Sequence, residues 1–282
     1  MEESAIKIVL AVLLLAVGTY YSLQLGKQFK PKATLVKGQY KKFPLIRKTI
    51  LSHNSAVYRF KLPTEDSILG LPVGQHITVK AVINEKTIIR SYTPTSLDTD
   101  SRGFFELLIK SYENGNMSKN FAELELNDTI ELSGPKGFYN YSPNCRKELG
   151  MVAGGSGITP MYQIIKAIAQ NPNDKTKVSL IYGNVAEKEI LLKKQLDDLV
   201  ATKPEQFRVY YVVDNPSEDW TGGVGYITAD VMKEYLPAPG HGVQLLVCGP
   251  LPMVSSVKRC AVALGFAKAK PVPKMEDEVF VF

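Results

Sequence analysis

A glycine-rich stretch, G-G-S-G-I-T-P at residues 154–160, has the composition of a phosphate-binding turn. The apolar run 149–153 precedes it, and an amphipathic run with helical spacing follows from Met161 to Ile168. We therefore predict a strand, a turn and a helix, with Thr159 as the helix cap and Pro160 at the first helical position. The turn would present backbone N–H groups and a positive helix end to a pyrophosphate. Alone, the pattern equally fits a glycine turn that binds no nucleotide.

Two stretches upstream carry groups that suit a flavin. R-S-Y-T-P at residues 90–94 ends a predicted strand, and G-N-M-S at residues 115–118 precedes a short helical run. Arg90 offers a charged fork to a pyrophosphate, Tyr92 a flat surface to an isoalloxazine ring, and Thr93 a hydroxyl to a ring nitrogen. Ser118 and its neighbouring amides start a helix, which is an anion site. Each stretch singly also fits ordinary surface residues, but together they supply what a flavin dinucleotide needs.

Two predicted strand ends in the second half of the chain carry further candidate groups. A carboxylate at Asp214 would accept hydrogen bonds from a ribose diol and repel a 2′-phosphate, although Asp-Asn-Pro also suits a solvated turn. C-G-P at residues 248–250 places a small side chain where a nicotinamide could pack, with a buried structural Cys248 as the alternative. The predicted strand before the one that leads to Asp214 ends in Y-G-N at residues 182–184, without the acid of the usual dinucleotide fingerprint.

The elements that must position these groups fall into two domains. Six short alternating stretches between residues 43 and 133, separated by Gly, Pro, Asn and Asp, predict an antiparallel sheet closed into a barrel. After residue 148, apolar strands alternate with helical runs, which predicts a doubly wound parallel sheet with ligands at its carboxyl edge. The fold class is thus α+β with two domains: a six-stranded antiparallel β-barrel at 43–145, which carries the flavin candidates, and a parallel α/β domain at 146–282, which carries the phosphate-binding turn.

The amino-terminal segment predicts a membrane anchor. Residues 8–26 are uncharged and strongly apolar, close to the length that crosses a bilayer as one helix. A cleaved signal peptide and a buried core helix are the alternatives, and the acidic residues before the apolar run disfavour the former. Lysines are concentrated in the basic linker 27–42, so the positive-inside rule places the carboxyl-terminal bulk of the chain in the cytosol. We expect an anchor at 1–26 in the endoplasmic reticulum or the mitochondrial outer membrane.

Composition excludes several other classes of protein. The chain has three Cys and three His, none in a metal-ligand spacing, so we expect no iron–sulfur cluster, haem ligand pair or zinc site. The net charge of +6 arises from the basic linker and its surroundings rather than from a basic face. No nucleic-acid partner is expected.

The ordered motifs R-x-Y-T, G-x-M-S, G-G-S-G-I-T-P-M and C-G-P resemble those of the ferredoxin-reductase-like flavoenzymes. Within that group the chain is similar to the NADH–cytochrome b5 reductases over residues 40–282. The resemblance implies FAD and NADH as cofactors and an FAD-dependent NADH:cytochrome b5 oxidoreductase. It also implies a monomeric catalytic head that passes single electrons to cytochrome b5 or a similar acidic haem protein.

The resemblance further implies roles for individual residues. A relay from His76 through Thr93 would handle the flavin proton, and Cys248 would position the nicotinamide. Asp214 goes with a preference for NADH, and Thr159 is a flavin contact. The remaining implied FAD contacts are Arg90, Ser91, Tyr92, Leu108, Lys110, Tyr112, Gly115, Asn116, Met117 and Ser118. The remaining NADH contacts are Gly154, Gly155, Gly157, Pro160, Gly249, Pro250 and Met253.

Two alternatives stay open. The same reductase module would also suit another acceptor, such as an iron chelate, a quinone or another small carrier protein. A non-catalytic nucleotide-sensing membrane adaptor could keep the fold, although the intact R-x-Y-T and G-x-M-S motifs argue against it.

Overall fold

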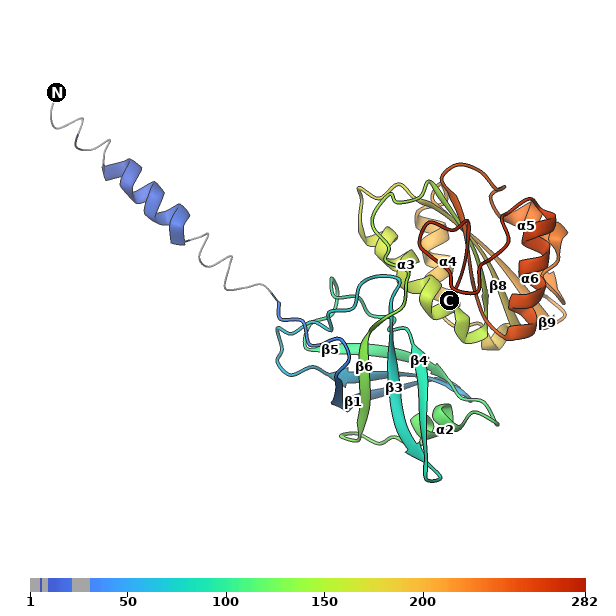
Figure 1. Ribbon diagram of the computed structural model, residues 1–282, viewed down its shortest axis with the longest axis horizontal. Coiled ribbons are helices and arrows are strands. Elements are labelled where there is room, and N and C mark those ends of the chain that lie inside the picture. The colour runs from blue at the N-terminus through green and yellow to red at the C-terminus, as the bar shows by residue number, and fades with distance from the viewer. Residues whose placement is uncertain (1–5, 7–9, 22–30) are drawn as a thin grey trace.

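The computed structural model describes residue 6, residues 10–21 and residues 31–282. Residues 31–282 form an antiparallel domain followed by a parallel α/β domain, and the two lie in contact (Figure 1). The elements of the antiparallel domain are β1 (Tyr40–Ser52), β2 (Ser55–Lys61), β3 (His76–Ile83), β4 (Lys86–Tyr92), β5 (Phe104–Lys110), α2 (Asn116–Glu123) and β6 (Thr129–Lys136). Those of the parallel domain are β7 (Glu148–Gly154), η1 (Gly155–Gly157), α3 (Ile158–Gln170), β8 (Lys177–Ala186), η2 (Glu187–Glu189), α4 (Lys193–Thr202), β9 (Phe207–Asn215), β10 (Gly223–Val224), α5 (Ala229–Tyr235), β11 (Val243–Cys248), α6 (Leu251–Ala263) and β12 (Val279–Val281).

The first sheet contains the six predicted strands but does not close. Its order is β4-β3-β6-β1-β2-β5, every pairing is antiparallel, and β4 and β5 are edges with no ladder between them among the described residues. The prediction of a closed barrel is therefore wrong. Instead of pairing with each other, β4 and β5 carry candidate flavin residues that line a cavity, and the second domain supplies the opposite wall of that cavity. An apolar core that includes Phe43, Phe60 and Phe105 fills the inside of the sheet.

The second sheet confirms the doubly wound prediction. Its order is β10-β9-β8-β7-β11-β12 with all pairings parallel, so the strand order reverses between β7 and β11. Successive residues of β7 belong to the apolar cores on opposite faces of the sheet: Met151 packs with α3 and α4, and Val152 packs with α5 and α6. The carboxyl ends of β7 and β11, at Gly154 and Cys248, lie side by side, where such folds bind ligands.

Two local predictions in this domain are wrong. Helix α3 begins at Ile158 after Gly157, so Pro160 is the third helical residue and not the first. Thr159 lies inside the first turn and donates its hydroxyl to the Ser156 carbonyl at 3.1 Å instead of capping the helix. The η1 turn of Gly155–Gly157 already bends the chain into the helix, which removes the need for a side-chain cap. Further along the chain, residues 187–202 do not form one continuous helix, because Leu192 adopts a left-handed φ of 59° between η2 and α4.

The segment between β6 and β7, which joins the two domains, packs against the parallel domain. The Tyr139 hydroxyl donates to Gln244 Oε1 at 2.9 Å, and the Tyr141 hydroxyl donates to the buried Asp174 carboxylate at 2.7 Å. The Tyr139 ring also packs edge-on against Phe280. These contacts fix the chain leaving β6 to β11, to β12 and to the loop before β8, so the domains are joined by a segment that is itself held in place.

The amino-terminal segment is described only in part. Residues 10–21 form a helix whose side chains are exposed, including Leu10 at 54% and Leu14 at 71%. The predicted span 8–26 and the linker 27–42 fall partly outside the described residues. Within residue 6, residues 10–21 and residues 31–282, no helix combines the length and apolarity needed to cross a membrane.

Candidate active site

A cavity of about 770 Å³ lies where the domains meet and contains most of the predicted site residues. We call it the flavin-side cavity because β4, β5 and the start of α2 line it. The turns after β7 and β11 contribute its other wall. The predicted residues that line it are His76, Arg90, Ser91, Tyr92, Thr93, Leu108, Lys110, Tyr112, Gly115, Asn116, Met117, Ser118, Gly154, Gly157, Thr159, Pro160, Cys248, Gly249 and Pro250.

A second cavity of about 540 Å³ adjoins the first at the carboxyl edge of the parallel sheet. We call it the strand-end cavity. It is lined by the remaining predicted residues, Gly155, Asp214 and Met253. Four residues line both cavities, namely Lys110, Tyr112, Gly154 and Pro250. Ligands in the two cavities would therefore share one wall, which is the arrangement that transfer between two nucleotides requires.

The end of β4 presents a cation and a ring to the flavin-side cavity. Arg90 is exposed and, within the described part of the chain, makes no ion pair, so its guanidinium is available to an anion. The Tyr92 ring packs edge-on against Phe121 of α2 with centroids 5.2 Å apart. Burial raises the pKa of Tyr92 to about 12, an effect that Arg90 opposes, so the ring is neutral at pH 7.

Two helices point uncapped amino-terminal ends at the cavities. Neither α2 nor α3 has a side-chain cap or an acidic residue in its first turn, so backbone N–H groups and the positive helix dipole remain for an anion. The Ser118 hydroxyl donates to the Gly115 carbonyl at 3.0 Å and accepts from the Tyr112 amide at 3.2 Å, which fixes the loop before α2. These two ends suit two pyrophosphates.

The glycine turn and the C-G-P turn touch backbone to backbone. A Cβ on Gly157 would lie 2.3 Å from the Cys248 carbonyl oxygen, and one on Gly154 would lie 2.6 Å from Met253 Sδ. Only glycine permits this approach, because any side chain would force the strand ends apart. The glycines thus place α3 and the C-G-P turn together at the switch point of the sheet.

The three residues predicted to act in catalysis lie in the flavin-side cavity, with different chemical states. Burial raises the pKa of the Cys248 thiol to about 12, so it is neutral and serves as a small packing group rather than a nucleophile. Burial and the charge of Lys136 lower the pKa of His76 below its ordinary value. His76 and Thr93 line the same cavity, but in the described structure no hydrogen bond joins them, so the relay is not preformed.

Two side-chain contacts cross between the domains at the shared wall. Lys110 is almost fully buried and pairs with Glu189 of η2 at 2.9 Å. The Tyr112 and Ser156 hydroxyl groups lie 3.3 Å apart. Lys110 and Tyr112 therefore connect the antiparallel domain to the strand-end turns. Glu189 was not predicted, since no local pattern marks a carboxylate 79 residues away as the partner of Lys110.

Three of the lining residues that were not predicted have side chains suited to a nucleotide. Asn184 lies near the carboxyl end of β8 and lines the same cavity as Asp214, and its buried Oδ1 accepts no hydrogen bond within the described chain, so it offers an acceptor to a ribose hydroxyl. Tyr226 lines the same cavity and is 87% exposed, which leaves its ring free to contact a base. Phe282 lines the flavin-side cavity, and its backbone amide donates a hydrogen bond to the Val247 carbonyl at 3.0 Å. The absence of an acid at the end of β8 was the one available signal for Asn184.

Comparison with known proteins agrees with the division of the chain into two nucleotide-binding domains. Residues 42–141 match the family model of the oxidoreductase FAD-binding domain, and residues 151–259 match that of the oxidoreductase NAD-binding domain. The "NADH-cytochrome b5 reductase 1" of Kluyveromyces lactis is 64% identical over 253 residues, covering 90% of each chain. The protein of the same name from Candida glabrata is 60% identical, covering 88% of this chain and 87% of that one.

Solved structures show the same two-domain arrangement. The cytochrome b5 reductase domain of Ulva prolifera nitrate reductase aligns with a TM-score of 0.83 at 31% identity, covering 89% of this chain and all of that one. The CS-b5R domains of human Ncb5or, in the NAD⁺ form, align with a TM-score of 0.73 at 26% identity, covering 86% of this chain and 69% of that one. The predictions of an oxidoreductase and of FAD and NADH as its cofactors are confirmed. The chain belongs to the NADH–cytochrome b5 reductase family.

Proposed function

We propose that this chain holds FAD in the flavin-side cavity and NADH in the strand-end cavity, and that it reduces cytochrome b5 or a similar haem carrier by single-electron transfer. The observation that carries the proposal is the wall shared by the two cavities, formed by Lys110, Tyr112, Gly154 and Pro250. The names of the relatives support the choice of acceptor. When bound, FAD supplies the conversion of one hydride into two single electrons.

The antiparallel domain would hold FAD through complementary charge and shape. Arg90 and the open amino-terminal end of α2 face an anion, and the pyrophosphate is the only strongly charged part of FAD. Tyr92 offers a ring held in place by Phe121, and Leu108 offers an apolar surface. This donor set fits a flavin dinucleotide.

The parallel domain would hold and orient NADH. The amino-terminal end of α3 suits the pyrophosphate, while Asp214 and the unpaired Asn184 Oδ1 accept from ribose hydroxyl groups. Cys248 and Thr159 lie at the junction, where a nicotinamide must approach the flavin ring. The neutral Cys248 thiol excludes water there without adding charge. His76, whose lowered pKa keeps it neutral at pH 7, can exchange a proton with Thr93 once a bound group or a rotation connects them.

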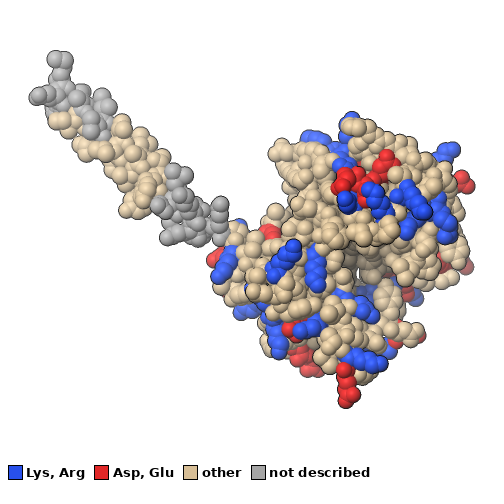
Figure 2. Space-filling view, in the orientation of Figure 1, with Lys and Arg blue, Asp and Glu red and all other residues tan. Residues whose placement is uncertain are grey.

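Basic side chains would guide an acidic haem partner to the cleft. On the face drawn in Figure 2, Lys and Arg are spread over both domains, with Asp and Glu between them. Long-range attraction of this kind accelerates encounters between carriers and is screened by salt. We propose that the reaction occurs at the endoplasmic reticulum or the mitochondrial outer membrane, with the catalytic domains in the cytosol. The apolar stretch 8–26 and the exposed leucines of residues 10–21 support an anchor.

Steady-state assays with purified acceptors test the proposal. We expect a higher kcat/KM for cytochrome b5 than for a quinone or an iron chelate, and a rate that falls as ionic strength rises. Equal rates for all three acceptors would indicate a general reductase. A chain lacking residues 1–26 should still reduce ferricyanide in solution but should turn over a membrane-bound acceptor poorly. Retention of that protein on vesicles would contradict the proposed anchor.

A further inference from the structure

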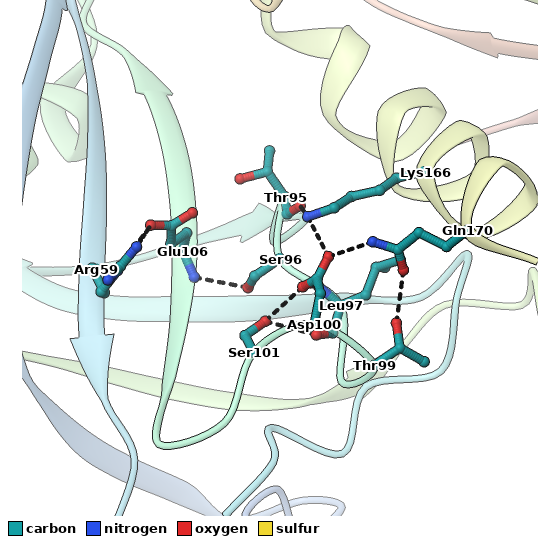
Figure 3. Close-up of polar contacts among 10 residues, drawn as sticks. All are labelled: Arg59, Thr95, Ser96, Leu97, Thr99, Asp100, Ser101, Glu106, Lys166 and Gln170. Carbon is teal, nitrogen blue, oxygen red and sulfur yellow. Dashed lines mark hydrogen bonds and ion pairs between the residues drawn. The ribbon is translucent and has the colours of Figure 1, made fainter. Parts of the chain in front are cut away.

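Helix α3 carries a polar face that lies against the antiparallel domain. Its apolar residues pack on the parallel sheet, as the core contacts of Ile164 and Ile168 show. Gln163, Lys166 and Gln170 recur at the i, i+3, i+7 spacing of another face. All three make hydrogen bonds to the antiparallel domain, and Figure 3 shows those of Lys166 and Gln170. The proposed function does not itself require such a cluster.

Asp100 is the centre of these contacts. Its Oδ2 lies 2.6 Å from Lys166 Nζ and accepts from Gln170 Nε2 at 2.7 Å (Figure 3). Lys166 also donates to the Thr95 carbonyl at 3.2 Å, and Thr99 donates to Gln170 Oε1 at 2.9 Å. Both members of the ion pair are about one-quarter exposed, so water screens the pair less than it screens a surface pair.

The other oxygen of Asp100 stiffens its own loop. Oδ1 accepts from the Leu97 amide at 3.0 Å and from the Ser101 hydroxyl at 2.9 Å. The loop is tied to β5 as well, because Ser96 Oγ accepts from the Glu106 amide at 2.9 Å. Burial raises the pKa of Asp100, but the donors Lys166 and Gln170 outweigh that effect, so its pKa lies below the usual value.

A second contact joins the same helix to a different loop. Gln163 is 1% exposed, its Oε1 accepts from the Gly74 amide at 2.6 Å, and its Nε2 donates to the Gln75 carbonyl at 3.4 Å. Gln75 directly precedes His76, which lines the flavin-side cavity. Gly74 has a φ of 93°, and a Cβ there would lie 2.5 Å from the Tyr139 ring, so this loop has little freedom of its own.

We propose that this face of α3 is a clamp that sets the width of the nucleotide cleft, with Lys166 and Asp100 as positioning residues for hydride transfer. The loop 95–101 continues from Thr93, and α3 begins beside Thr159, so the clamp joins both walls of the cavity. Lys166 lies about 10 Å along the helix axis from Thr159, at 1.5 Å per residue. Because reacting atoms must come within about 3–3.5 Å, a small rotation of α3 about this point would misalign the nicotinamide and flavin rings.

The inference rests on the proposed placement of FAD and NADH. Its structural part, the ordering of the two loops by α3, can be measured without hydride transfer. Lys166→Ala removes the contacts of Lys166 with the Asp100 carboxylate and the Thr95 carbonyl. It leaves the hydrogen bonds of Asp100 Oδ1 intact. Lys166→Arg can restore the ion pair. Lys194→Ala is the matched control, because Lys194 pairs with Asp198 on the exposed side of α4.

Two readouts are compared across these variants with FAD bound. Amide hydrogen exchange should accelerate in segments 71–76 and 94–102 of Lys166→Ala and stay unchanged in β1 and β2. The rate of flavin reduction by NADH should fall roughly tenfold at unchanged flavin content, the loss expected for one partly buried charge-assisted pair. Lys166→Arg should recover most of the rate, and Lys194→Ala should match the parent.

Unchanged exchange in both loops, or a full reduction rate despite faster exchange, would overturn the inference. If Lys166→Ala does not retain FAD, Asp100→Asn carries the same test, because its amide oxygen can still accept from Leu97 while the ion pair is lost. If Lys166→Ala changes hydrogen exchange as expected but the parent protein shows no flavin reduction by NADH, the result contradicts the proposed function and not the clamp. The two failures are therefore distinguishable.

Discussion

The two walls of the cleft are built on different plans. The antiparallel domain forms its wall along the unpaired edges β4 and β5, where buried Leu108, Met117 and Ser118 line a large cavity. The parallel domain forms its wall from strand ends, with exposed Asp214 and Tyr226 at the rim. An enclosing wall suits a cofactor that stays bound, and an open rim suits a substrate that leaves after each turnover. Substitutions on the two walls should therefore affect different quantities.

The largest effect is expected from Arg90→Ala, on the enclosing wall. Arg90 has no ion-pair partner among the described residues, so its loss removes ligand contacts without breaking the fold. FAD affinity should fall roughly a hundredfold, as for two charge-assisted hydrogen bonds. The ratio of flavin absorbance to protein absorbance after gel filtration measures this. Arg208→Ala, at an exposed position of β9, is the control, and full flavin retention in Arg90→Ala would remove Arg90 from the site.

On the open rim, Asp214→Thr should change the choice of nucleotide and leave FAD bound. Removing the carboxylate relieves its repulsion of a 2′-phosphate, so the ratio of kcat/KM for NADPH to that for NADH should rise roughly tenfold. Ferricyanide assays with each nucleotide give the ratio. An unchanged ratio would show that the preference is set elsewhere.

A smaller effect is expected from Asn184→Ala at the same rim. The unpaired Oδ1 of Asn184 would lose one ribose hydrogen bond, so KM for NADH should rise roughly fivefold with kcat for ferricyanide nearly constant. Flavin content serves as the internal control. A fall in kcat without a change in KM would argue that Asn184 acts on the reacting groups instead of the ribose.

The smallest effect is expected from His76→Gln on the enclosing wall, as a change in how stability depends on pH. The folded protein lowers the pKa of His76, so the unfolded chain binds its proton more readily and stability falls as pH drops below about 6.5. His76→Gln removes that contribution. The difference in melting temperature between parent and variant should therefore shift in favour of the variant as the pH is lowered from 7 to 5. A difference independent of pH would show that His76 does not titrate between the two states.

The sequence predicted the parts of this molecule that depend on local pattern. Alternating strands, the glycine turn and the strand-end Asp214 all follow from residues near one another in the chain. Every predicted site residue lines one of the two cavities. The residue-by-residue roles came from a motif resemblance, which supplied what spacing alone left open.

What could not be predicted depends on packing between distant segments. The sheet stays open at β4 and β5, although the alternation of its strands is the same as in a closed barrel. Lys110 with Glu189 and Asp100 with Lys166 join residues far apart in the sequence and across the domain boundary. Thr159 had good cap chemistry, but the preceding turn of three residues had already begun the helix. The two ion pairs depend on segments distant in the sequence, whereas the start of α3 depends on the turn immediately before it.

Anaerobic titration of the FAD-loaded protein with NADH tests the central claim most directly, because it asks whether the two cavities place the nucleotides within reach of each other. We predict that one equivalent of NADH bleaches the flavin absorbance fully, and that Asp214→Thr lowers the rate of bleaching but not its final extent. A protein that binds both FAD and NADH yet keeps its flavin absorbance would contradict the shared wall as the place of hydride transfer.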